Sequence, residues 1–258
     1  MIDNIKEIQV LGSKLSLLSE EELLTEIKNQ IITGNKHIRI LSGNIHSNNL
    51  AHNLDWYCQC LNAAEFVRLD GEGIRWGAKV LGYSTPKRTT WADFAWSLGK
   101  FGENEGFTFY FLGGSPGIAE LAKRELERKY PKILIIGTHH GYFNKDKKSE
   151  ENKMVIDQIN LLQPNILIVG LGMPIQEKWL LENYLDLNVN VIFTGGAVFD
   201  YISGNTKRAP RWMTDHGLEW LGRLIIEPRR LWKRYIIGIP IFFWRVFLQR
   251  LGLLKVQD

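Results

Sequence analysis

The residues best suited to chemistry lie in the stretch 67–74, where an apolar run delivers the carboxylate of Asp70 into a turn made by two glycines. In an open α/β sheet, ligands bind at the carboxyl ends of strands, where such turns lie. A carboxylate in that place can take a proton from a hydroxyl nucleophile. The structural alternative is that Asp70 caps the helix predicted after Ile74, and on this stretch alone capping is the commoner role.

A second group of candidates surrounds the glycine turn 113–117 (GGSPG). Gly114 and Ser115 precede a predicted helix, and the free N–H groups at a helix N-terminus favour an anion such as phosphate. The turn lacks the G-x-G-x-x-G spacing, so a plain tight turn is the alternative. Gly141 and Tyr142 end a comparable turn, and we assign all four residues to nucleotide binding.

The stretch 172–179 (GMPIQEKW) combines a turn with two polar side chains in the first helical turn. Gln176 can hydrogen-bond sugar hydroxyls or a base edge, and Glu177 can accept from ribose hydroxyls. The helix dipole alone would also account for Glu177, but not for Gln176. We therefore place Gly172 and Glu177 at the nucleotide and Gln176 at the substrate.

No spacing in the sequence indicates a metal centre. His139 and His140 have no further ligands nearby at helical or turn spacing, so they are expected to line a pocket or hold a loop. Asp70 and Glu72 resemble the Asp-x-Asp of metal-dependent nucleotide-sugar enzymes only weakly, and we expect no metal cofactor.

Positive charge is concentrated after Gly204. This tail carries a net charge of +7 and the remainder −3, within a total of +4. Such a tail is expected to meet an anionic partner. Arg230 and Arg234 share one helical face, and two guanidinium forks suit a pyrophosphate. The alternative is a solvated or lipid-facing cationic surface.

The elements that position these residues alternate between strand and helix. Strands are expected at 5–11, 37–41, 63–69, 107–112, 132–136, 166–169 and 189–193, and helices at 19–32, 46–60, 118–129, 149–162 and 176–184. Alternation of this kind predicts an α/β fold with a mostly parallel, Rossmann-like sheet and helices on both faces. The glycine turns all follow strands, so they should gather at one edge and build one site.

We divide the chain into an α/β catalytic core, residues 1–203, and a helical C-terminal appendage, residues 204–258. The apolar run 236–254 is interrupted by Pro240 and flanked by basic residues. It is too short to span a bilayer and suits a helix lying in the membrane interface, although docking on the core or on a second subunit is the alternative. Two cysteines one residue apart indicate no disulfide framework, and no secretory signal is expected.

The motif order then identifies a resemblance. LDGEGI, FLGGSPGIAE, GTHHGYF, GLGMPIQEKW, TGGAVFDYISG, KRAPRWM, GLEWLGRL and EPRRLWKRY, over about 41–235, resemble the WecG/TagA/CpsF family of bacterial glycosyltransferases. The resemblance implies an inverting transfer of N-acetylmannosamine, its uronic acid or another hexose from a UDP-sugar to a polyprenyl-diphosphate-linked sugar in cell-surface polysaccharide synthesis. It places the protein peripherally on the cytoplasmic face of the membrane, with no nucleic-acid partner. A homo-oligomer is possible.

The resemblance also implies roles for single residues. Asp70 matches the general base, and Arg88 is assigned to catalysis with it. Asn44 matches a substrate contact, and Ser42 stands where the family has Thr. The remaining substrate-binding assignments are Gln176 and four arginines of the appendage, Arg211, Arg223, Arg230 and Arg234.

Two alternatives belong to other classes. An NAD-type Rossmann oxidoreductase needs G-x-G-x-x-G after its first strand and an acidic residue about 20 positions later, and the first strand here has neither. A non-catalytic membrane-associated adaptor would bind no UDP. Calorimetry with UDP and with NAD separates both from a transferase.

Overall fold

An eight-stranded sheet forms the centre of the protein in the computed structural model, which describes residues 5–254 and, at Asp215, the backbone alone. The strand order is β1-β2-β4-β3-β8-β7-β5-β6, and every neighbouring pair is parallel except the hairpin β1/β2. The strands are β1 (Glu7–Val10), β2 (Ser13–Ser16), β3 (Ile38–Gly43), β4 (Phe66–Leu69), β5 (Thr108–Gly113), β6 (Leu134–His139), β7 (Ile166–Gly170) and β8 (Val191–Thr194).

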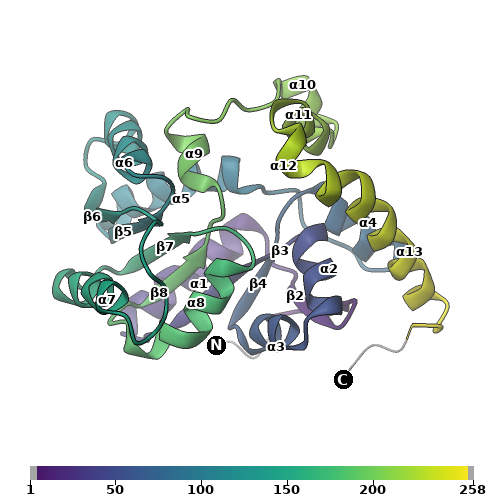
Figure 1. The fold of residues 1–258 in the computed structure, drawn as a ribbon, viewed down its shortest axis with the longest axis horizontal. Helices are drawn as coiled ribbons and strands as arrows, with labels where there is room; N and C mark the ends of the chain where they lie inside the picture. Colours follow the sequence, from purple (N-terminus) through teal and green to yellow (C-terminus); the bar gives the residue numbers. More distant parts are fainter. Residues whose placement is uncertain (1–4, 255–258) are drawn as a thin grey trace.

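Helices cover both faces of the sheet because successive strand residues alternate between two apolar cores. Phe66 points into one core and Val67 into the other, as do Phe111 and Leu112. One core is completed by α1 (Glu20–Ile32), α5 (Trp91–Glu105), α6 (Ile118–Lys129) and α9 (Val198–Ile202). The other is completed by α2 (Ile45–Asn53), α3 (Asp55–Ala63), α4 (Glu72–Val80), α7 (Glu150–Leu162), α8 (Ile175–Asn183) and α13 (Gly238–Arg250). The predicted fold class is confirmed (Figure 1).

Three local expectations were wrong or incomplete. The strand expected at 5–11 is the first half of a hairpin that turns at Leu11 and Gly12, both with positive φ. The helix expected at 46–60 is two helices, because Leu54 is extended between α2 and α3. Helix α5 was not predicted, although it covers much of one core.

The carboxyl ends of the parallel strands meet at one edge, as expected from the glycine turns. Two of these turns touch, since Gly114 N–H donates to Gly170 O at 3.2 Å. A Cβ on Gly113 would lie 2.3 Å from Gly170 O, so the backbones of β5 and β7 can approach this closely only with glycine there.

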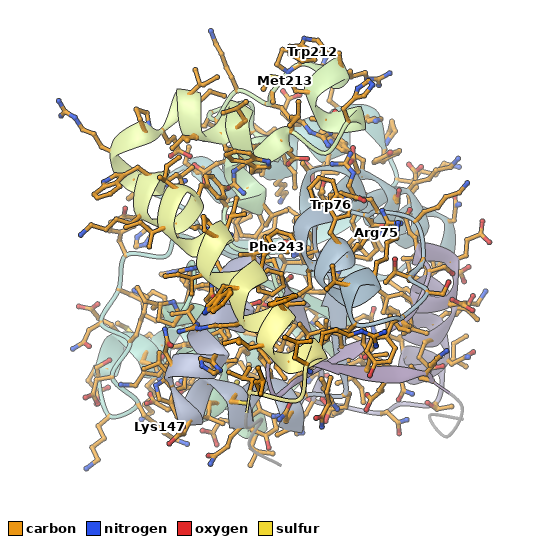
Figure 2. All side chains as sticks on the ribbon, turned by 90° about the vertical axis from the view of Figure 1, so that its right-hand side faces the viewer. Arg75, Trp76, Lys147, Trp212, Met213 and Phe243 are labelled. Carbon is orange, nitrogen blue, oxygen red and sulfur yellow. The ribbon has the colours of Figure 1, made fainter. Side chains whose placement is uncertain are left out.

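The C-terminal residues form α10 (Arg211–Asp215), α11 (Glu219–Ile226), α12 (Pro228–Trp232), a π-helical turn η2 (Lys233–Ile237) and α13. Figure 1 shows α12 and α13 running beside α4 and α2, and Figure 2 looks onto α13 (yellow). Within residues 5–254, no helix is both long enough and apolar enough to cross a membrane. The division at residue 204 stays a prediction, and residues 1–4 and 255–258 of the two predicted parts lie outside the described residues.

Helix α13 is held on the core by Phe242 and Val246, both fully buried. The Phe242 ring lies over Gly77 of α4, where an added Cβ would come within 2.6 Å of the ring. Gly77 therefore makes room for the ring, and the packing of α13 depends on this contact.

Phe242→Ala should release α13 without unfolding the sheet. Removing a buried Phe side chain costs about 3–5 kcal/mol, and here most of the lost contacts attach α13. We expect hydrogen exchange of the α13 amides to rise about a hundredfold or more while β3, β7 and β8 stay protected. Phe247→Ala is the control, because that side chain is 47% exposed on the same helix. Unchanged protection of α13 would contradict this account.

Candidate active site

A cavity of about 650 Å³ lies at the carboxyl edge of the sheet. Its floor is formed by the ends of β3, β4, β7 and β8, and α11, α12, η2 and α13 cover it from the other side. Of the predicted site residues, it is lined by Ser42, Asn44, Asp70, Arg88, Gly172, Arg223, Arg230 and Arg234. Residues far apart in sequence thus meet in one place, which is where an open α/β sheet binds its ligands.

Asp70 follows the last residue of β4 and is 19% exposed at its side chain. Its Oδ1 accepts from Trp91 N at 3.2 Å, and its Oδ2 is 3.4 Å from Asn44 Nδ2. The N-cap of α4 is Gly71, without a side-chain cap, so Asp70 does not cap the following helix. It faces the cavity and contacts the N-terminus of α5 instead.

Arg68 lies beneath Asp70, with its Nη1 3.6 Å from Asp70 Oδ1. The guanidinium is 6% exposed and stacks on Trp91 and Phe94 at 5.2 and 4.8 Å, while Nη2 donates to Thr89 O. Burial lowers the pKa of Arg68, and the Asp70 charge acts in the opposite direction. Sequence reasoning missed this role, and its only signal was a charge inside an apolar strand.

The side chains of Asn44 and Ser42 hydrogen-bond mainly to neighbouring residues of the protein. Asn44 is the N-cap of α2, where its Oδ1 accepts from the N–H groups of His46 and Ser47 at 3.0 Å, leaving Nδ2 near Asp70. Ser42 is 2% exposed, and its Oγ accepts from Trp91 Nε1 and donates to Thr194 O. Both therefore fix the walls around Asp70, and their predicted substrate contacts stay predictions.

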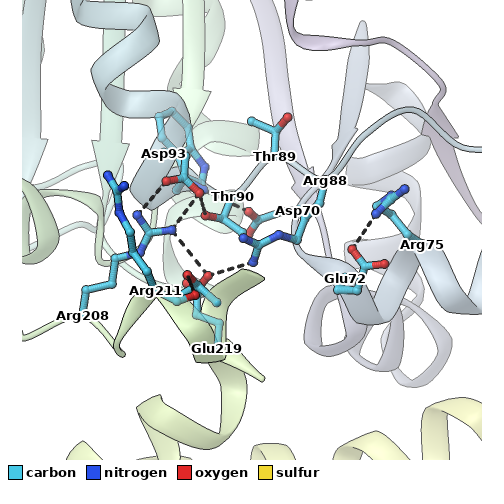
Figure 3. A network of polar contacts seen from close by, with 12 residues as sticks. Asp70, Glu72, Arg75, Arg88, Thr89, Thr90, Asp93, Arg208, Arg211 and Glu219 are labelled. Carbon is cyan, nitrogen blue, oxygen red and sulfur yellow. Dashed lines mark hydrogen bonds and ion pairs between the residues drawn. The ribbon is translucent and has the colours of Figure 1, made fainter. Parts of the chain in front are cut away.

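Arg88 reaches the cavity but is paired. Its Nη1 donates to Glu219 of α11 at 3.2 Å, and the same carboxylate oxygen lies 3.7 Å from Arg208. Arg208 also forms a two-pronged pair with Asp93 at 2.6 and 2.7 Å. Figure 3 shows this chain of ion pairs joining α11 to the start of α5. Glu219 was not predicted, because its hydrogen-bond partner Arg88 lies 131 residues away along the chain.

Arg223 and Arg234 are different, because none of the ion pairs among the described side chains includes either one. Both are partly buried, and Arg223 Nε has no hydrogen-bond partner. Arg223 lies over Tyr201 and Arg234 over Tyr235 at 5.3 and 5.7 Å. Burial lowers the pKa of Arg234, yet a guanidinium stays charged at neutral pH. Two guanidiniums without an ion pair among the described side chains thus face the cavity that holds Asp70.

The other predicted residues lie apart from this cavity. Gly114, Ser115, Gly141 and Tyr142 sit together on the adjoining edge at β5 and β6, where Gly141 N–H donates to Gly114 O at 2.8 Å. Tyr142 is 70% exposed and borders a smaller cleft with both predicted histidines, His139 and His140. Arg211 is exposed and does not line the large cavity. The turns therefore share one edge but do not all line one cavity.

The sequence pattern of the Glycosyl transferase WecG/TagA/CpsF family matches residues 8–256, almost the whole chain. This chain belongs to that family.

Curated relatives agree with the assignment. The chain is 24% identical over 244 residues, covering 94% of this chain and 93% of the relative, to the N-acetylglucosaminyldiphosphoundecaprenol N-acetyl-beta-D-mannosaminyltransferase of Staphylococcus aureus strain NCTC 8325 / PS 47. The protein of the same name from strain MW2 is 23% identical with the same coverage. The protein is therefore a glycosyltransferase, and the oxidoreductase and adaptor alternatives have no support.

In this glycosyltransferase, Gln176 does not line the cavity itself but hydrogen-bonds the backbone of two turns that do. It is fully buried, and its Oε1 accepts from Gly172 N and Gly196 N at 3.2 and 3.0 Å, which ties the turns after β7 and β8 together. Its Nε2 donates to Glu177 Oε1 at 2.8 Å. Glu177 is 1% exposed and does not line the cavity, so its predicted nucleotide contact stays a prediction.

His46, at the start of α2, is a cavity residue that the sequence did not reveal. Burial, helped by the charge of Arg234, lowers its pKa to about 4. The imidazole is therefore neutral at pH 7 and can offer a hydrogen bond to a sugar hydroxyl without adding charge. A lone His in a polar stretch carries no signal of this placement.

No group of three or more His, Cys, Asp or Glu side chains within the described residues is arranged to hold a metal ion. Metal independence of the enzyme stays a prediction.

Glu177→Gln should make the protein more stable at high pH. Burial raises the pKa of Glu177 from 4.5 to about 7. Between pH 4.5 and pH 7 the unfolded chain binds fewer protons at this residue than the folded chain does. The free energy of unfolding therefore falls as the pH rises through this range, and above pH 7 it is lower by about 3 kcal/mol. Denaturant titrations at pH 5 and pH 8 should show the variant gaining on the wild type at pH 8. The exposed Glu150→Gln controls for the lost charge, and a pH-independent difference would contradict the account.

Proposed function

We propose that this glycosyltransferase transfers N-acetylmannosamine, or a related hexose, from a UDP-sugar to a sugar carried on a polyprenyl diphosphate, with inversion at the anomeric carbon. The observation that carries the proposal is a single cavity in which the Asp70 carboxylate faces the guanidiniums of Arg223 and Arg234, which form no ion pair with the described side chains. A base and an anion-binding wall are the two groups that such a transfer requires. The names of the Staphylococcus aureus relatives support the lipid-linked acceptor.

In the proposed reaction, Asp70 removes the proton from an acceptor hydroxyl as that oxygen bonds to the anomeric carbon. The bond from this carbon to the UDP oxygen breaks on the opposite face, and UDP leaves with the electron pair. A single displacement of this kind inverts the anomeric centre. Asp70 Oδ2 is the oxygen available for the proton, because among the described residues it receives only the long contact from Asn44.

Arginines near Asp70 are proposed to stabilise the negative charge that develops on the departing diphosphate. Arg223 lies within the electrostatic reach of Asp70 and Glu219, and fixed charges aimed at a developing anion contribute several kcal/mol in comparable sites, about 3–4 for one donor. Arg88 can join them by exchanging its partner Glu219 for a phosphate oxygen, since a guanidinium binds phosphate and carboxylate with the same fork. This is the catalytic role that we propose for Arg88.

The nucleotide is proposed to follow the edge from Gly172 towards Gly114, Ser115, Gly141 and Tyr142. Two hydrogen bonds join these turns into one surface, Gly114 N to Gly170 O and Gly141 N to Gly114 O. Backbone amides of glycine turns allow close approach of phosphate and ribose.

The covering helices are proposed to rest on the cytoplasmic surface of the membrane. Their exposed apolar side chains include Ile225, Ile226, Trp232, Ile236 and Trp244, and the neighbouring α10 adds Trp212; each is at least 42% exposed. Lysines and arginines lie among them, and this mixture suits an interfacial helix on an anionic surface. A lipid-linked acceptor would then reach the cavity from the bilayer. A homo-oligomer stays a prediction.

Asp70→Asn keeps the shape of the side chain and removes the base. We expect turnover with UDP-N-acetylmannosamine and a lipid-diphosphate N-acetylglucosamine to fall about 10²–10⁴-fold. The fold should stay intact, with some loss of thermal stability because the buried Arg68 loses its charged partner. Asp186→Asn, whose side chain is exposed, should transfer normally, and NMR of the wild-type product should show the inverted anomer. Near-normal turnover by Asp70→Asn would exclude Asp70 as the base, and a retained anomer would exclude the single displacement.

Replacing Ile236 and Trp244 together by Asp should weaken binding to vesicles of anionic phospholipid at least tenfold. The two substitutions remove apolar surface that would contact the lipid and add negative charges that the anionic surface repels. Vesicle co-sedimentation measures this. Leu161→Asp is the control, since Leu161 is 83% exposed on the distant α7. Equal binding by the double variant and the wild type would mean that these helices do not face the membrane.

A further inference from the structure

The active-site cavity extends away from Asp70 between two helices. One side is formed by α2 and the other by η2 and α13. We call this extension the α2–α13 groove, and it is lined by His46, Asn49, Leu50, Asn53, Ile237, Gly238, Ile241 and Arg245. Ile237, Ile241 and Arg245 are four residues apart, so they share one face of the helix. His46, Asn49, Leu50 and Asn53 share one face of α2 in the same way.

Hydrogen bonds join the two helices along the groove. Asn49 Nδ2 donates to Gly238 O at 2.8 Å. Arg245 donates to Asn49 Oδ1 at 3.0 Å and to Asn53 Oδ1 at 2.8 Å. These two bonds close the far end. Arg234 and Ile241 both line the cavity, and seven residues of helix separate them by about 10 Å, which is the length of a short ligand segment.

The chemistry changes along the groove. Near Asp70 stand Arg234, without an ion-pair partner among the described residues, and Arg230, which is paired with Glu227 at 3.0 Å. Beyond them, Ile237 and Ile241 are 44% and 39% exposed. Apolar side chains exposed inside a cavity favour a hydrocarbon over water. The amides of Asn49 and Asn53 already hydrogen-bond Gly238 and Arg245, so they are less available to sugar hydroxyls.

We propose that the α2–α13 groove binds the first isoprene units of the lipid acceptor, with the acceptor diphosphate at Arg234 and Arg230. This inference rests on the proposed function, and it adds a binding site for the lipid chain of the acceptor, which the proposed function does not place. A charged diphosphate followed by a hydrocarbon matches the order of arginine and isoleucine along the groove. The rest of the lipid leaves past Ile241 towards the exposed Trp244, on the surface proposed to meet the membrane.

The first test measures binding without a donor. Farnesyl diphosphate, which carries isoprene units, and inorganic pyrophosphate, which carries none, are titrated into the protein by calorimetry. The wild type should bind farnesyl diphosphate at least tenfold more tightly, the gain expected from burying a few methylene groups. Ile241→Asp should lose this preference and keep its pyrophosphate affinity, which also shows that the variant is folded.

The matched control is Leu251→Asp, because Leu251 follows α13, is 53% exposed and does not line the cavity. It should keep the preference. The proposal is overturned if the wild type binds both compounds equally, if it binds neither, or if Ile241→Asp keeps the farnesyl preference.

The second test separates the groove from the reaction. Transfer is measured in detergent with two acceptors that differ only in the lipid, a long polyprenyl chain or a short alkyl chain that ends before Ile237. Ile241→Asp should lower kcat/KM at least tenfold for the long acceptor and less than threefold for the short one. Equal losses with both acceptors would overturn the groove while the proposed function stands. No transfer to either acceptor by the wild type would overturn the proposed function itself.

Discussion

The site depends on two guanidinium groups, Arg223 and Arg234, that lie partly buried in a cavity without an ion pair among the described residues. Charge that is removed from water and left unpaired is costly, so such an arrangement persists where an anion completes it. Their neighbours Arg88 and Arg208 are already neutralised by Glu219 and Asp93. Arg223 and Arg234 are therefore the arginines that can bind an anion without first giving up a carboxylate, which makes a diphosphate the natural occupant of the cavity.

The two sides of the cavity are held by different means. Asp70 belongs to the sheet, where its N–H donates to Gly43 O at 2.8 Å and its carboxylate is fixed by Trp91, Asn44 and Arg68. The free arginines stand on helices whose attachment to the core runs through the Phe242 ring and the Glu219 ion pairs. The base is therefore set rigidly by short-range geometry, while the anion-binding wall is placed by a few long-range contacts.

This division also explains what the sequence could predict. The parallel sheet, the order of its turns and the position of Asp70 follow from local signals, namely apolar runs that end in glycines. The β1/β2 hairpin was missed because its strands are short and half polar, and α5 because Gly99 and Gly102, which disfavour a helix, interrupt its sequence. Other placements depend on partners from distant strands and helices. They are the burial of Gln176, the ion pair of Arg88 and the position of Arg68 under Asp70. Local sequence does not encode them.

The central claim is that Arg223 and Asp70 belong to one nucleotide-sugar site, and UDP calorimetry tests it most directly. UDP should bind the wild type in a salt-dependent manner. Arg223→Met should weaken UDP binding about ten- to a hundredfold, which is the contribution expected from a hydrogen bond to a charged group. The exposed Arg229→Met should bind as the wild type does. No UDP binding by the wild type, or equal losses in both variants, would contradict the account.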